Sequence, residues 1–141
     1  MKKHDVAIVG IADAPLREGK LAEPGSPLQV IARCAHAALA QAGLTLKDVD
    51  ALFTAGMWGQ PGAGQLMTIS VAEYLGIAPR LTDGTNIGGS AFEAHVAHAA
   101  LALEQGRCDV ALIVYGSTQR SEMSRNLAGR PANLPLPYET P

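Results

Sequence analysis

The stretch from Arg80 to Gly106, RLTDGTNIGGSAFEAHVAHAALALEQG, decides the fold of this 141-residue chain. Arg80–Asp83 predicts a short strand, and a helix opens at Gly88 or Gly89 and runs through Gln105 before the final glycine. Alanines lie all round this helix, which is typical of a central helix with layers packed on both faces. The turn between strand and helix would sit at a helix N-terminus, where N–H groups favour an anion or a developing oxyanion.

Strands and helices alternate along the rest of the chain. The capping signals of Ser26-Pro27-Leu28-Gln29 predict a helix that stops at Gly43. The other expected elements are strands at Val6–Gly10, Val49–Ala55 and Val110–Gly116, a helix at about Gln65–Leu75, and loops at 11–25 and Gly56–Gly64. This rhythm predicts an α/β fold with a mainly parallel sheet covered by helices, in which function gathers at the carboxyl ends of the strands.

Composition excludes several classes of function. Hydrophobic residues make up 48% of the chain and charged residues 17%, and this apolar surplus predicts surface that another subunit or segment covers. The net charge is −2 with scattered basic residues, so no nucleic-acid partner is expected. No segment is long enough for a membrane span or resembles a signal peptide, so we expect no membrane partner and a cytoplasmic location.

Two units of unequal character are expected. Residues 1–117 form an α/β half-domain, and residues 118–141 form a proline-rich loop segment that leads toward a missing remainder. Cys34 and Cys108 have no ligand-like spacing, so neither zinc nor a disulfide framework is expected. Cys108 precedes a buried strand at the end of the sheet opposite the turn, which favours a structural role.

The turn from Asp83 to Ser90 is the candidate site. It matches neither phosphate-binding loop: the Walker pattern requires Lys where Ser90 stands, and no G-x-G-x-x-G follows a strand. A glycine turn that merely lets strand and helix pack explains the spacing equally well. Ser90 is expected to cap the helix, and His95 and His98 are expected to be packed and hydrogen-bonded rather than metal-binding.

The glycine loop after the second expected strand is surrounded by large flexible side chains. Met57, Trp58 and Met67 would line an acyl channel or form an interface between subunits. An interface is slightly favoured, because aromatic and methionine side chains are enriched there.

Two segments carry a resemblance to a known family. Gly88-Gly89-Ser90-Ala91-Phe92-Glu93-Ala94, followed by Gly106 and the Cys108–Ser117 run, resembles the N-terminal catalytic region of the thiolase superfamily. The likeness is closest to sterol-carrier-type thiolases, often labelled lipid-transfer proteins or acetyl-CoA acetyltransferases. It implies a thiolase-like layered fold, action on acyl-CoA in lipid metabolism, and no cofactor or metal, with the coenzyme A thioester as substrate.

Departures from the family pattern change the expected chemistry. Aligned on Ser90 and Ala94, the family's nucleophilic cysteine falls on Gly88, which has no side chain to acylate. The later His and Cys motifs of the family have no counterpart, so the sequence resembles less than half of such a protein. The resemblance implies no catalytic residue here and a substrate-binding set of Asn86, Gly88, Gly89, Ser90 and Met57.

Two functions stay open at this stage. The first is a thiolase-like acyltransferase or lyase part that joins or cleaves carbon–carbon bonds of acyl-CoA, by retro-aldol rather than Claisen chemistry. The second is a non-catalytic thiolase-fold subunit that binds lipid or acyl-CoA or completes a hetero-oligomer. The implied partners are acyl-CoA and either a second copy in a homodimer, a thiolase C-terminal half, or a DUF35-type (OB-fold and zinc-ribbon) subunit.

Overall fold

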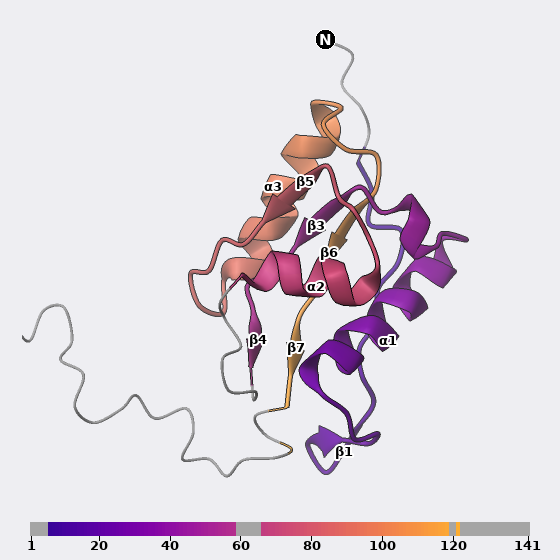
Figure 1. The fold of residues 1–141 in the computed structure, drawn as a ribbon, viewed down its shortest axis with the longest axis vertical. Coiled ribbons are helices and arrows are strands. Elements are labelled where there is room, and N and C mark those ends of the chain that lie inside the picture. Colours follow the sequence, from indigo (N-terminus) through magenta and orange to yellow (C-terminus); the bar gives the residue numbers. More distant parts are fainter. Residues whose placement is uncertain (1–5, 59–65, 119–120, 122–141) are drawn as a thin grey trace, which may run out of the picture.

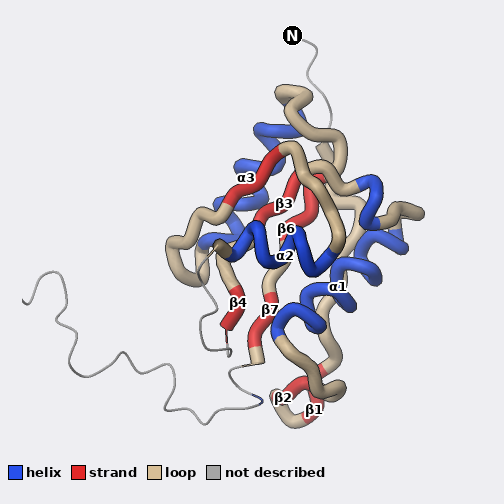
Figure 2. Tube along the Cα trace, viewed as in Figure 1, coloured by secondary structure: helices blue, strands red, loops and turns tan. Residues whose placement is uncertain are grey.

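A computed structural model describes residues 6–58, 66–118 and 121 (Figure 1). The larger elements are helices α1 (Pro27–Gln41), α2 (Met67–Leu75) and α3 (Ala91–Glu104) and strands β3 (Ala51–Phe53), β5 (Leu81–Asp83) and β6 (Ala111–Ile113). The smaller ones are β1 (Leu16–Arg17), β2 (Lys20–Leu21), η1 (Leu46–Asp48), β4 (Met57–Trp58) and β7 (Gly116–Ser117). Figure 2 shows how the strands alternate with the helices.

The main sheet is parallel, as the sequence predicts, and its strand order is β5–β3–β6. Leu52 of β3 lies opposite Thr82 on one side and Leu112 on the other. The segments that follow β3 and β6 pair again, as β4 and β7. The carboxyl ends of these parallel strands therefore lie at the same end of the sheet, and the candidate turn lies at that end.

Helices cover both faces of the sheet and divide the core into two clusters. On one face, α1 and α2 pack against the sheet through Ile31, Leu52 and Val71. On the other face, α3 packs through Ala99 and Ala102 against Phe53 and its neighbours. Figure 1 shows α2 in front of the sheet and α3 behind it. The expected α/β fold, a mainly parallel sheet covered by helices, is thus confirmed.

The start of α1 confirms its capping signals. The Ser26 side chain accepts a hydrogen bond from Gln29 N at 3.3 Å, and Gln29 Oε1 accepts one from Ser26 N at 2.8 Å. Pro27 occupies the first turn, where its missing N–H costs nothing. The local sequence therefore fixes where this helix begins.

Three expectations were wrong. Val6–Gly10 is not a strand, because no strand lies beside it among the described residues, and an apolar run forms a ladder only where a partner edge exists. The expected loop at 11–25 contains the β1–β2 hairpin, whose turn holds Glu18 and Gly19 at positive φ. Helix α3 is covered on one face only, since Val96 and Leu101 are exposed. The loop residues 59–65 and the segment 122–141 lie outside the described residues.

Candidate functional site at the β5–α3 turn

The turn between β5 and α3 is an exposed loop with a defined backbone. Gly88 adopts φ +77°, and its N–H donates to Asn86 Oδ1 at 3.2 Å. Ala91 N donates back to Gly88 O at 3.1 Å, which closes the turn into the helix. A Cβ atom placed on Gly88 would meet nothing within 4 Å, so only the backbone angle disfavours other residues there.

Ser90 occupies the N-cap position of α3 but does not cap it. Its backbone has helical angles (φ −77°, ψ 0°), and its side chain makes no capping hydrogen bond. The expected capping role is therefore wrong, because a cap side chain reaches the first-turn N–H groups only from an extended backbone. By the geometry of an α-helix, the N–H groups of Phe92 and Glu93 have no intrahelical partner and face the turn. The site thus offers backbone donors rather than side-chain groups.

An Asp–His pair anchors the base of this turn. Asp83 Oδ1 accepts hydrogen bonds from Thr85 N at 2.8 Å and Thr85 Oγ1 at 2.7 Å, and Asp83 Oδ2 lies 2.6 Å from His98 Nδ1. His98 is seven residues beyond Ala91, about 10 Å along the helix axis. It is therefore too far along α3 to touch a group held at the helix N-terminus, and the pair fixes the loop instead.

These hydrogen bonds lower the pKa of the Asp83 carboxyl. Partial burial alone would raise the pKa of this carboxyl, but the hydrogen bonds from Thr85 and His98 outweigh it and hold the pKa at about 2. Because the folded pKa lies below the ordinary value of 3.8, the unfolded chain takes up a proton first as the pH falls. The stabilisation is present above about pH 4 and is lost towards pH 2.

Asp83→Asn is expected to lose this acid dependence. Between pH 4.5 and pH 2, the free energy of unfolding of the wild type should fall by about 1–2 kcal/mol more than that of the variant. Urea denaturation followed by circular dichroism at both pH values measures the difference. Equal losses in the two proteins would show that the Asp83 bonds do not stabilise the fold.

The two histidines of α3 have different environments. His98 is hydrogen-bonded, as expected, but His95 is not: it is fully buried, and neither ring nitrogen has a partner. His95 packs instead between aromatic rings, with its centroid 6.0 Å from that of Phe53 and 5.9 Å from that of Phe92. The expectation of a hydrogen-bonded His95 was wrong because its neighbours are apolar. The described residues hold no cluster of His, Cys, Asp and Glu that could bind a metal.

The predicted substrate-binding residues fall in two places. Asn86, Gly88, Gly89 and Ser90 share the exposed turn, whereas Met57 is buried in the core cluster of α1 and α2. Met57 is held there because β4 pairs with β7, placing it opposite Gly116. The structure therefore brings together the turn residues but not Met57.

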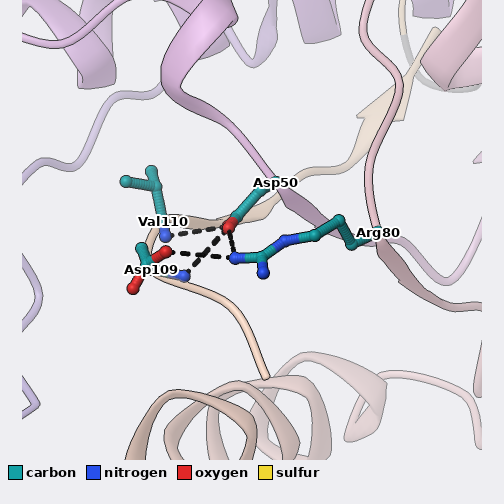
Figure 3. A network of polar contacts seen from close by, with 4 residues as sticks. All are labelled: Asp50, Arg80, Asp109 and Val110. Atoms are coloured by element: carbon teal, nitrogen blue, oxygen red, sulfur yellow. Dashed lines mark hydrogen bonds and ion pairs between the residues drawn. The ribbon is translucent and has the colours of Figure 1, made fainter. Parts of the chain in front are cut away.

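A polar network that sequence reasoning missed lies at the opposite end of the sheet (Figure 3). Asp50 accepts hydrogen bonds from the N–H groups of Asp109 and Val110 at 3.1 and 2.9 Å and pairs with the Arg80 guanidinium. Arg80 Nη2 also lies 3.0 Å from Asp109 Oδ2. Partial burial opposes ionisation of Asp50, but these bonds prevail and lower the pKa of its carboxyl. The available signal was positional: Asp50 and Arg80 directly precede β3 and β5, and Asp109 stands two residues before β6.

Both cysteines lie away from the turn. Cys108 is buried beside the start of β6, where burial raises the pKa of its thiol. Cys34 is half-buried in α1, and burial raises its thiol pKa as well. Neither thiol is activated as a nucleophile. His36 is exposed on α1.

Comparison with known proteins identifies the fold. No family profile and no curated protein matches the sequence. Among solved structures, a variant of OleA from Xanthomonas campestris bound with cerulenin matches 84% of this chain with a TM-score of 0.66 at 18% identity. The fold is thiolase-like. A second OleA variant, with bound lauric acid and lauroyl-CoA, matches 79% of the chain with a TM-score of 0.62 at 18% identity.

A third neighbour with this thiolase-like fold is more similar in sequence. The Ltp2–ChsH2(DUF35) aldolase matches 76% of the chain with a TM-score of 0.61 at 30% identity. The chain spans 46% and 43% of the two OleA chains and 26% of the aldolase chain. It therefore corresponds to less than half of each.

None of the described helices is long and apolar enough to cross a membrane.

Proposed function

We propose that this chain is the N-terminal half-domain of an acyl-CoA-processing enzyme that makes or breaks carbon–carbon bonds without a covalent acyl intermediate at the turn. The observation that carries the proposal is Gly88, which occupies the apex of the turn where the thiolase resemblance places the nucleophile. A glycine there leaves backbone donors at the helix N-terminus but no group to acylate. The similarity to an aldolase at 30% identity supports the same chemistry.

Retro-aldol cleavage requires only non-covalent assistance from such a site. A base removes the proton of the β-hydroxyl, and the hydroxyl oxygen becomes the oxygen of a carbonyl product as the carbon–carbon bond breaks. The electron pair of the broken bond forms a thioester enolate. N–H donors at the start of α3, such as those of Phe92 and Glu93, would stabilise the enolate oxygen. His98 lies too far along the helix to be the base, so we propose that a partner segment or subunit of the thiolase C-terminal or DUF35 type supplies it.

The decisive experiment restores the missing thiol. After incubation with lauroyl-CoA, the intact mass of the wild type should stay unchanged, whereas Gly88→Cys should gain one lauroyl group mapped to the new cysteine. The new side chain has room, because no atom lies within 4 Å of its Cβ position, and a thiol at a helix N-terminus has a lowered pKa.

Gly89→Cys is the matched control, because its Cβ position is equally open and lies one residue away. It should be acylated far more slowly if Gly88 marks the reacting position. Acylation of the wild type would contradict a mechanism without a covalent intermediate. Equal acylation of the two variants would contradict the assignment of Gly88 to the nucleophile position.

A second function rests on a different observation. The exposed surface carries large apolar side chains on two helices: Val96 and Leu101 on α3, and Ile69 and Tyr74 on α2. Such surface favours a non-catalytic subunit that completes a hetero-oligomer. Co-purification with a thiolase C-terminal half or a DUF35-type subunit, with no turnover of 3-hydroxyacyl-CoA by the complex, would favour this alternative over the enzyme.

A further inference from the structure

The turn that carries Gly88 extends well beyond the end of β5. Strand β5 ends at Asp83, whose carboxylate lies beside His98 in the third turn of α3, whereas the chain enters this helix only at Ala91. Seven residues of α-helix rise about 10 Å. Residues 84–90 therefore form an arm that follows α3 from its root at Asp83 back to the start of the helix.

The root of the arm lies between two helices. On one side, a Cβ atom at Gly84 would lie 3.6 Å from Thr68 Cγ2 near the start of α2, which is ordinary van der Waals contact. On the other side, Asp83 Oδ2 lies 2.6 Å from His98 Nδ1. The second oxygen, Asp83 Oδ1, accepts hydrogen bonds from Thr85 N and Thr85 Oγ1. A single carboxylate therefore joins the first residues of the arm to the body of α3.

The direction of the hydrogen bond between Asp83 and His98 follows from the charge of the carboxylate. The pKa of Asp83 is about 2, so at neutral pH its side chain is ionised and can only accept hydrogen bonds. His98 must therefore carry a hydrogen on Nδ1, which is possible in both the neutral and the charged imidazole. The bond consequently holds the root of the arm in both protonation states of the histidine.

The outer part of the arm has no comparable connection to another element. The hydrogen bonds that its residues make in the described part of the chain stay within the arm and the first turn of α3. Asn86 Oδ1 accepts from Gly88 N at 3.2 Å, and Gly88 O accepts from Ala91 N at 3.1 Å. Residues 86–90 are exposed. The position of the arm therefore depends on the helix at one end and on the carboxylate at its root.

We infer that Asp83 and His98 form a clamp that holds the arm where the reaction needs it, with His98 acting through Asp83 as a positioning residue. The inference rests on the proposed function, because the arm places Gly88 against the first N–H groups of α3, the site proposed for the enolate. Misplacement of reacting groups by about 1 Å can cost a factor of about 100 in rate. Loss of the clamp should therefore slow the chemistry although no hydrogen-bond donor of the site is removed.

Amide hydrogen exchange, followed by nuclear magnetic resonance, tests the clamp in the 141-residue chain without any substrate. His98→Leu removes the donor to Asp83, and the amides of Thr85 and Gly88 should then exchange at least about fivefold faster than in the wild type. His98→Asn should restore slow exchange, because its side-chain N–H can take the place of the Nδ1–H group. His36→Leu, the same substitution at an exposed position of α1, should leave both amides unchanged.

The Gly88→Cys variant tests whether the clamp serves the site. In this background, His98→Leu should slow acylation by lauroyl-CoA about tenfold, and His98→Asn should return the rate to within about twofold. The rescue separates positioning from catalysis by the imidazole, because asparagine keeps the bond to Asp83 but cannot act as a base.

Three results would overturn the inference: unchanged amide exchange in His98→Leu, failure of His98→Asn to restore it, or equal acylation with and without the bond to Asp83. A Gly88→Cys protein that is not acylated at all would count against the proposed function instead. The exchange rates would still decide whether the clamp holds the arm, since they are measured without substrate.

Discussion

Gly116→Ala is expected to lower the free energy of unfolding by about 3 kcal/mol. Gly116 lies in β7, directly against the first turn of α1. A Cβ atom at this position would lie 2.3 Å from Pro27 O and 2.8 Å from Ile31 Cγ1. The first of these is backbone, so it cannot rotate away, and the helix would have to move off the sheet. Urea denaturation followed by circular dichroism measures the loss.

Gly89→Ala is the matched control for this prediction. Gly89 has no atom within 4 Å of its Cβ position and does not need a positive φ. Its replacement by alanine should change the free energy of unfolding by no more than about 0.5 kcal/mol. If both variants were equally stable, the contact between β7 and α1 would be looser than the structure has it.

Asp50→Ala is expected to cost about 2–4 kcal/mol of the free energy of unfolding. The substitution leaves the N–H groups of Asp109 and Val110 without their acceptor and removes the partner of the Arg80 guanidinium. These residues stand at the starts of the three parallel strands, so the loss affects every strand pairing in the sheet. The same denaturation experiment measures it.

Asp109→Ala tests whether the stability comes from the backbone hydrogen bonds to Asp50 or only from the number of charged side chains. The Asp109 side chain also pairs with Arg80, but it is 87% exposed, and both backbone N–H bonds drawn in Figure 3 end on Asp50 instead. Exposed ion pairs contribute about 0–1 kcal/mol, so this variant should stay close to the wild type. Equal destabilisation by the two variants would indicate that charge, rather than the backbone bonds to Asp50, holds the strands together.

The sequence predicts correctly the elements that are determined by residues within or directly beside them. Helix α1 begins where Ser26 and Gln29 form a capping box, and β3 and β6 fall within continuous apolar runs. Val6–Gly10 has the same kind of run but is not a strand. Strand pairing depends on a neighbouring strand that can be distant in sequence, and an apolar pattern carries no information about that neighbour.

The candidate site was predictable in outline but not in its side-chain contacts. The glycine-rich pattern places the turn at the start of α3. The bond between Asp83 and His98 joins residues on different elements, and the unpartnered His95 depends on which side chains surround it. Both are tertiary outcomes, and neither has a signature in residue spacing. Ser90 shows the same limit, because its residue type favours a cap that its backbone angles forbid.

The network of Asp50 and Arg80 stands at the amino ends of the strands, whereas the turn at Gly88 stands at their carboxyl ends. The residues whose replacement is expected to destabilise the fold are thus physically separated from those to which the proposed chemistry is assigned. Residues 86–90 are exposed, so most of them can be exchanged at little thermodynamic cost, and at Gly88 only the positive φ disfavours a side chain. If the proposed function holds, a scaffold of this kind can lose or acquire a nucleophile at the turn and still fold, so its reaction type can change without loss of the fold.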